Sequence, residues 1–444
     1  MLQVWSPDWL AQKIEVRWSA KRRRLAQGIH DSAILSRAFS SFLILVGFFL
    51  IWFWTPPKVH LFSVDWTPLD FLTRMIFRGP IAMGWVLVAG GLILWLPRWR
   101  RTFETAALVT SIATLLTASQ AMDSSAALAI VLTGVLPALG FYYHLRRQTR
   151  LSFWLMIACL PLGIVIAQGL ADFGFLQQVN YFTNQPRFFM ILWLYAAEVR
   201  ANSAAFAPNS SLFLSYAFSP AQLLTNICLP TSMFKLSPLH WEEVLKGLEI
   251  LALILLYMVI TLTLFQNLNR EDFRFNSWQD FVTFGGLNYL KYYFLSYASL
   301  SSAEAAFRFL GYDLLSMFKT PFLAPSPHER WQRWSTTFYE FLKFMVFIPL
   351  LRRLKSPFFA VLITFWVSFL LHEVAFFLRL SDEESSFYAE RTMMMKFVFF
   401  TLHGLAVYAS LKTAKKWPSG QALRGWAGCA LTFLIMAVIH AFAP

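Results

Sequence analysis

One histidine and one glutamate interrupt a long apolar segment of the chain. His372 and Glu373 are the only ionisable residues in the run FFAVLITFWVSFLLHEVAFFL, residues 358–378. An ionisable group in such a segment is costly inside a membrane and is therefore a candidate functional group. Imidazole, with an unperturbed pKa of about 6.5, is the side chain best suited to act as a general base at neutral pH. The alternative is a structural histidine bonded to a carbonyl of a neighbouring helix.

A second candidate segment combines tryptophan, arginine and serine. It reads SPHERWQRWS, residues 326–335, and an apolar run follows at 336–351. Trp331, Arg333, Trp334 and Ser335 therefore lie at the mouth of the next helix. A guanidinium between two tryptophans can hold a phosphate or pair with a carboxylate. The alternative is an interfacial anchor, since Trp and Arg are common at membrane boundaries.

The stretch from Tyr292 to Ser335 resembles the core of the membrane-bound O-acyltransferase (MBOAT) family, most closely its bacterial polysaccharide O-acetylation branch. The matching residues are Leu310, Gly311 and Tyr312, then Phe318, Lys319 and Pro321, and finally Ser326, Pro327, Trp331, Arg333 and Trp334. Further along, His372 falls at the family's catalytic histidine, and Leu402, His403 and Gly404 match a leucine-histidine-glycine pattern. The order and spacing of these matches cover residues 290–405.

Three positions depart from the family pattern. Ser335 stands where the bacterial branch has histidine and the protein- or lipid-modifying branches have asparagine or aspartate. Glu373 replaces a glycine after the catalytic histidine, and Leu371 replaces a tryptophan before it. These departures concern the substrate class more than the fold. They also leave a non-catalytic member as an alternative.

The resemblance implies acyl transfer from a thioester, such as acyl-CoA, to a hydroxyl, with no cofactor and no metal. His372 is then the general base, and Ser335 can donate one hydrogen bond to the developing oxyanion, a weaker contribution than that of a histidinium. Trp331, Arg333, Trp334, His403 and Glu373 are expected to line the substrate cavity. For His403, a structural role through a hydrogen bond between helices is an equally good interpretation. A serine nucleophile activated by His372 is a less favoured alternative.

Long apolar runs along the chain are expected to form the helices that position these residues. A run long enough to cross a bilayer has about 17–25 residues. Such runs, with a few shorter ones, lie at 38–55, 79–97, 104–122, 125–144, 151–171, 187–198, 244–265, 279–299, 336–351, 358–378, 394–411 and 424–442. Prolines interrupt the intervening segment 199–242, which is expected to form re-entrant or short helices inside the protein. The expected fold is an all-α polytopic membrane protein, an MBOAT-like bundle of about 11 transmembrane helices around a central cavity.

Composition supports lipid as the solvent. Hydrophobic residues make up 57% of the 444 positions and charged residues 14%, against about 45–50% and 25% in ordinary globular proteins. The net charge of +14 comes largely from short basic loops, such as Lys21–Arg24, Arg98–Arg101 and Arg146–Arg150. Such loops mark cytoplasmic ends of spans and do not indicate nucleic-acid binding. Three well-separated cysteines give no metal-ligand or disulfide spacing.

These patterns divide the chain into residues 1–35, a basic segment that is cytoplasmic and lies on the membrane surface, and one transmembrane domain, 36–444, with its catalytic core at 280–410. The resemblance implies an enzyme of the bacterial inner membrane with a cytoplasmic N-terminus. It would pass an acyl group, acetyl in this branch, to an extracytoplasmic polysaccharide or to a partner acyltransferase outside the membrane. The alternatives are a lipid-alcohol acyltransferase, a silent relative acting as a scaffold, and a transporter.

Overall fold

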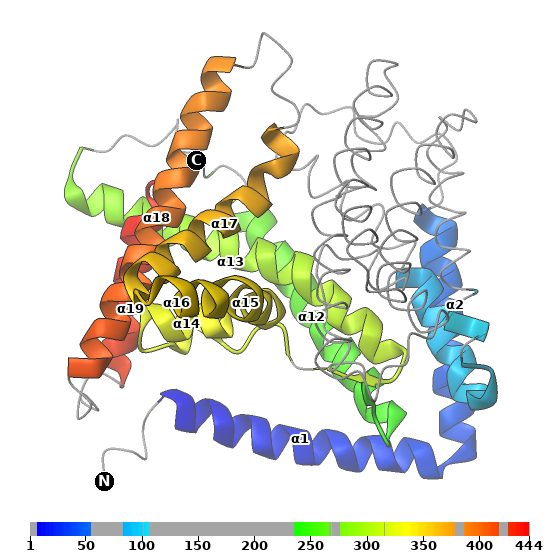
Figure 1. Ribbon diagram of the computed structural model, residues 1–444. Helices are drawn as coiled ribbons and strands as arrows, with labels where there is room; N and C mark the ends of the chain where they lie inside the picture. Colours follow the sequence, from blue (N-terminus) through cyan, green and yellow to red (C-terminus); the bar gives the residue numbers. More distant parts are fainter. Residues whose placement is uncertain are drawn as a thin grey trace, which may run out of the picture. The chain divides into compact units, whose positions relative to one another are not determined.

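The computed structural model describes residues 7–54, 83–100, 102–104, 106, 235–265, 268, 276–314, 316–377, 386–416 and 425–443. The described residues are mostly helical (Figure 1). Among them, three helices are long and apolar enough to cross a membrane, namely Ala33–Ile51, His240–Leu264 and Met393–Thr413. Shorter apolar helices lie at Met83–Trp95, Pro357–Leu370 and Trp426–His440. The expectation of an all-α membrane protein agrees with these helices, while the number of 11 spans stays a prediction.

Several predicted spans correspond closely to observed helices. The run 38–55 is α2 (Ala33–Trp54), 244–265 is α12 (His240–Leu264), 358–378 is α17 (Pro357–Phe377) and 424–442 is α19 (Trp426–His440). The runs 279–299 and 394–411 belong to longer helices, α13 (Trp278–Phe309) and α18 (Ser386–Lys416). The predicted spans between 107 and 198, and almost all of the interrupted segment 199–242, lie outside the described residues.

The N-terminal basic segment forms a helix, α1 (Pro7–Asp31). Its apolar side chains Ile14, Val16 and Trp18 are all exposed. Exposed apolar groups on a basic helix are typical of a helix at a membrane surface. The position of α1 on the cytoplasmic leaflet stays a prediction.

The run 336–351 is not one regular helix. It consists of α15 (Thr336–Leu342), the π-helical segment η6 (Lys343–Phe347) and α16 (Ile348–Leu354). Pro349 lies at the start of α16 and cannot donate a backbone hydrogen bond. A π-turn inside a helix is rare and holds one residue more than the α-helical pattern.

The chain divides into two compact units. The first comprises Met1–Arg24, Leu251–Ser301 and Leu315–Pro444, and the second comprises Leu25–Ile250 and Ser302–Leu314. In the first unit, α17 packs along α18, and the short helix α14 (Pro327–Arg333) contacts both α18 and α19 (Figure 1). A 3-10 turn, η5 (Pro321–Leu323), leads into α14 and also contacts α19. These elements carry the predicted site residues.

The second unit contains α2, the helix Met83–Trp95, the first turns of α12 and the last turns of α13. Gly47 and Gly84 allow a close approach of α2 and the helix Met83–Trp95, since a Cβ on either would overlap the carbonyl oxygen of the other. A 3-10 turn, η2 (Pro97–Trp99), follows that helix. Strands β1 (Lys235–Leu236) and β2 (Tyr312–Asp313) pair antiparallel. Gly311 joins α13 to β2 with φ +86°, a conformation that favours glycine.

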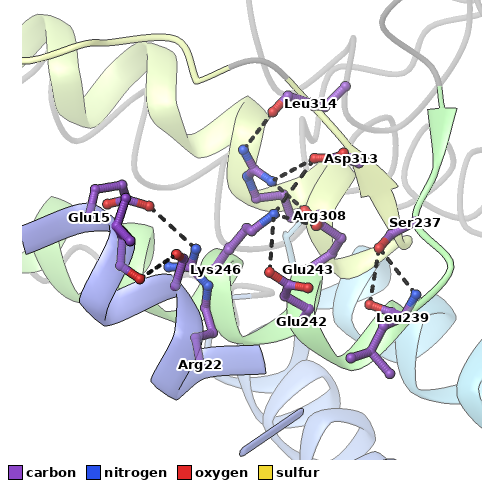
Figure 2. A network of polar contacts seen from close by, with 12 residues as sticks. Glu15, Arg22, Ser237, Leu239, Glu242, Glu243, Lys246, Arg308, Asp313 and Leu314 are labelled. Atoms are coloured by element: carbon purple, nitrogen blue, oxygen red, sulfur yellow. Dashed lines mark hydrogen bonds and ion pairs between the residues drawn. The ribbon is translucent and has the colours of Figure 1, made fainter. Parts of the chain in front are cut away.

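A buried ion network joins α12, the end of α13 and the β2 segment (Figure 2). Arg308 of α13 bonds Glu304 at 2.7 Å, pairs with Glu243 of α12 and donates to the carbonyl oxygen of Leu314 at 2.8 Å. Lys246 lies 2.6 Å from Glu243 and 3.7 Å from Asp313. Burial alone lowers the pKa of Arg308, but the carboxylates of Glu304 and Glu243 outweigh it and raise that pKa above its ordinary value.

Candidate active site

His372 lies one turn before the end of α17, and its side chain is exposed. Its Nδ1 is 2.7 Å from the carbonyl oxygen of Ser368, one turn earlier. A carbonyl accepts only, so Nδ1 carries the hydrogen, and in the neutral ring Nε2 keeps its lone pair. Phe338 packs edge-on against the ring at 5.4 Å and Phe400 lies at 5.3 Å. The helix therefore holds His372 with Nε2 in the form that a general base requires.

Ser335 immediately precedes α15 and is buried, with 6% of its surface exposed. Its φ of 44° is left-handed, which is uncommon for a residue other than glycine. The next residue, Thr336, fixes the backbone after Ser335. Its N–H donates to the carbonyl oxygen of Met317 at 2.8 Å, and its hydroxyl donates to the carbonyl oxygen of Ser316 at 2.8 Å. Phe338, three residues after Ser335 in the sequence, packs against the His372 ring.

Three predicted residues come together in the interior of the first unit. The Trp331 ring lies 5.1 Å from the His403 ring, edge-on, and 6.4 Å from Trp334. His403 is on α18 and the tryptophans are on and directly after α14, so a contact between two helices assembles the group. Phe365 of α17 completes one side, 5.4 Å from Trp331. The three side chains therefore share one environment, and their role in lining a substrate cavity stays a prediction.

Arg330 is a central member of this group that the sequence analysis did not identify. Only 1% of its surface is exposed. Its guanidinium lies over three aromatic rings, at 4.9 Å from Tyr289, 4.7 Å from Trp331 and 4.4 Å from Trp334. Its Nε donates to the Tyr289 hydroxyl at 3.0 Å. These contacts are cation–π interactions in a desolvated place, where they are strongest.

His440 of α19 is the other residue that sequence analysis missed. Its ring is 5.6 Å from His403 and 4.9 Å from Tyr289, and 3% of its surface is exposed. A usable signal was present, because His440 is an ionisable group inside the predicted span 424–442, as His372 is inside 358–378. For Arg330 the sequence offers no comparable signal, since a charged residue in a polar segment is normally solvated.

His403 has the same local arrangement as His372. Its Nδ1 lies 2.9 Å from the carbonyl oxygen of Phe399, so Nε2 keeps a lone pair in the neutral ring. His403 differs in burial, with 1% of its surface exposed. The predicted alternative, a hydrogen bond from His403 to a neighbouring helix, does not describe this Nδ1 contact, which lies within α18.

Arg333 is placed differently from its two tryptophan neighbours. It lies 3.3 Å from Glu329 and donates to the carbonyl oxygen of Leu323 at 3.1 Å. The contact with Leu323 joins α14 to η5, and the contact with Glu329 lies within α14. Glu373 follows His372 in α17. A substrate-binding role for Arg333 and for Glu373 stays a prediction.

The chain is similar to a plant protein described as "Probable long-chain-alcohol O-fatty-acyltransferase 6", from Arabidopsis thaliana. The two are 34% identical over 126 residues, which is 26% of this chain and 34% of the relative. The chain therefore matches about a third of that relative's length. No family model matches the sequence. The similarity supports a relationship to O-acyltransferases.

Proposed function

We propose that the protein is a membrane O-acyltransferase of the MBOAT family that transfers a fatty acyl group from a thioester donor to a lipid alcohol. The observation that carries the proposal is the orientation of His372, whose Nδ1 is fixed by the Ser368 carbonyl so that Nε2 is the basic atom. The resemblance over residues 290–405 and the similarity to a long-chain-alcohol O-fatty-acyltransferase support the reaction class.

In the proposed reaction, Nε2 of His372 takes the proton from the acceptor hydroxyl. The oxygen then attacks the thioester carbonyl carbon, and the carbonyl becomes an oxyanion. When this intermediate collapses, the C–S bond breaks, the ester remains, and the thiolate takes the proton from His372. A hydrogen bond from Ser335 to the oxyanion would be a neutral one, which is weaker than one from a charged donor.

A second candidate is transfer of an acetyl group to an extracytoplasmic polysaccharide or to a partner acyltransferase. The motif order from Leu310 to Trp334 favours it, because it resembles the bacterial O-acetylation branch. Under this second candidate, the protein would lie in the bacterial inner membrane with its N-terminus in the cytoplasm. The similarity to a fatty-acyl enzyme is the reason to place it second.

The test uses the purified full-length chain in lipid nanodiscs, supplied in turn with palmitoyl-CoA and hexadecanol or with acetyl-CoA and an oligosaccharide. Release of free CoA and ester formation are measured. His372→Ala is expected to lower kcat by about 10²–10⁴-fold, as loss of a general base does. His30→Ala, which alters an exposed histidine of α1, is the matched control and should leave kcat unchanged.

The preferred donor decides between the two candidates. Turnover with palmitoyl-CoA supports the lipid-alcohol proposal, and turnover with acetyl-CoA alone supports polysaccharide O-acetylation. Absence of turnover with every donor and acceptor, in folded protein, would favour a silent scaffold or a transporter. Full activity of His372→Ala would remove His372 as the base.

A further inference from the structure

The Arg330 guanidinium is a buried cation without a counter-ion in the described part of the chain. No carboxylate described in the structure forms an ion pair with it, and its Nη1 has no hydrogen-bond partner among the described residues. An isolated charge in a protein interior is strongly unfavourable unless it is paired and hydrogen-bonded. The aromatic rings around Arg330 offset part of this cost but accept no conventional hydrogen bond from Nη1. An anionic oxygen is the group that this atom lacks.

Other unpaired nitrogen atoms surround Arg330. The buried Nε1 of Trp331 and Nε2 of His403 have no partner within the described residues, and the same holds for both ring nitrogens of His440. Buried polar atoms of this kind are normally hydrogen-bonded, so these five nitrogen atoms, with that of Arg330 included, indicate a missing occupant. Trp331 Nε1 can only donate, as can Arg330 Nη1. The Arg330 guanidinium carbon lies 4.7 Å from the centre of the Trp331 ring, so the two donors are close enough to contact one carboxylate or one oxyanion.

The surroundings of this polar group are apolar. Tyr289, Phe322, Phe399 and Phe433 pack around it, together with Leu402. Phe433 also lines an apolar groove between α13 and α19 with a volume of about 290 Å³. This volume is just below the range for small-molecule pockets, about 300–1,000 Å³. An occupant with an anionic head and an aliphatic chain matches both the donors and their setting.

We propose that Arg330 and Trp331 bind the anionic oxygen end of an aliphatic acyl group. This end is the carboxylate of a free fatty acid, or the oxyanion that forms when the carbonyl of the acyl donor is attacked. The link to acyl transfer rests on the proposed function, whereas the binding of a fatty carboxylate does not. In the transfer reaction, Arg330 would supply a charged oxyanion donor, which Ser335 cannot.

The experiment measures binding of radiolabelled decanoate to the full-length chain in lipid nanodiscs, without any thioester. Decanoate should compete far better than acetate, which lacks the chain, and better than decanol, which lacks the charge. Arg330→Gln is expected to weaken decanoate binding about 10- to 100-fold, the effect of removing a charged hydrogen-bond donor. Arg352→Gln, an exposed arginine on α16, is the matched control and should bind as the unmodified chain does.

A second variant guards against misfolding. Trp331→Phe removes the Nε1–H and keeps an aromatic ring, and about 5- to 10-fold weaker binding is expected from loss of one neutral hydrogen bond. Equal affinity for decanoate and decanol, or full binding by both variants, would overturn the proposal. Equal competition by acetate would overturn the aliphatic part of it.

The test of decanoate binding can fail or succeed independently of the test of acyl transfer. His372→Ala should lose acyl transfer and keep decanoate binding. Decanoate binding that depends on Arg330, in a chain without any transferase activity, would support this site and refute the proposed reaction. Turnover without decanoate binding would support the proposed reaction and refute this site.

Discussion

His372 and His403 show how a helix selects the basic nitrogen of a histidine. In each ring, Nδ1 lies within 2.9 Å of the carbonyl oxygen four residues earlier, which leaves Nε2 as the acceptor. The two differ in environment, since His372 is exposed and His403 is buried. The same backbone device thus presents one basic nitrogen at the end of α17 and one inside the protein.

A third histidine, His328, is expected to make the stability of the fold depend on pH. Burial, and then the positive charge of Lys343, lower the pKa of His328 below its ordinary value of 6.5. The neutral ring also lies 2.8 Å from the side-chain nitrogen of Gln332. The unfolded chain therefore takes up a proton near pH 6.5 while the folded chain does not, so stability is lost as the pH falls through that value.

The variant His328→Gln cannot titrate and should reduce this dependence. The unfolding temperature of the unmodified chain in detergent is expected to fall more between pH 7.5 and pH 5.5 than that of the variant. Identical falls in both proteins would contradict the assignment of this acid sensitivity to His328.

At the scale of elements, a glycine determines how closely α13 and α19 pack. A Cβ added at Gly285 would overlap the carbonyl oxygen of Ala437. Three residues along α13, Asn288 donates to the carbonyl oxygen of His440 at 3.0 Å. This packing brings Tyr289 and His440 together, because both residues lie next to these contacts. Small residues at helix contacts are the common way for membrane helices to approach closely.

Gly285→Ala is therefore expected to separate the two helices and disturb the Arg330 environment. We expect a loss of about 1–3 kcal/mol in stability, as for other overpacked sites, and weaker decanoate binding. Gly28→Ala in α1 is the control, since a Cβ there would have no atom within 4 Å. Thermal unfolding and decanoate binding are measured for both. Equal effects of the two substitutions would contradict a special role for Gly285.

The sequence predicted elements better than contacts. Long apolar runs predicted α2, α12, α17 and α19, because hydropathy over about 20 residues requires no knowledge of partners. The pattern at 336–351 gave no sign of the π-helical segment Lys343–Phe347. Trp331, Trp334 and His403 were selected from their types and the resemblance. Arg330 was not, because its burial depends on α13 and α19 packing around α14, which no local pattern encodes.

At the scale of the whole molecule, charged residues are buried in different ways in the two units. In the second unit, Arg308 bonds Glu304, and it also bonds Glu243 and the Leu314 carbonyl oxygen, which Figure 2 shows. In the first unit, Arg330 has aromatic neighbours and an unpaired Nη1 among the described residues. The saturated network has a structural role, since it leaves the arginine little capacity for a ligand. The contrast supports a binding role for Arg330.

Substitutions in the Arg308 network are expected to change the stability of the protein and not its binding of ligand. Arg308→Ala would remove an ion-pair partner from two buried carboxylates, Glu304 and Glu243, so we expect about 3–5 kcal/mol of destabilisation. Once folded protein is obtained, decanoate affinity should be unchanged. Thermal unfolding and binding at a low temperature measure the two effects separately. Little change in unfolding temperature would contradict the structural role.

The π-turn at Lys343–Phe347 has a consequence for comparing this chain with its relatives. A π-turn accommodates one additional residue within a helix, with α-helical geometry on both sides. A relative that lacks one residue here can keep α15 and α16 with the same faces, although its alignment shows a gap in an apolar helix. A single-residue gap at this place is therefore a change of turn type, and the residues on either side remain equivalent.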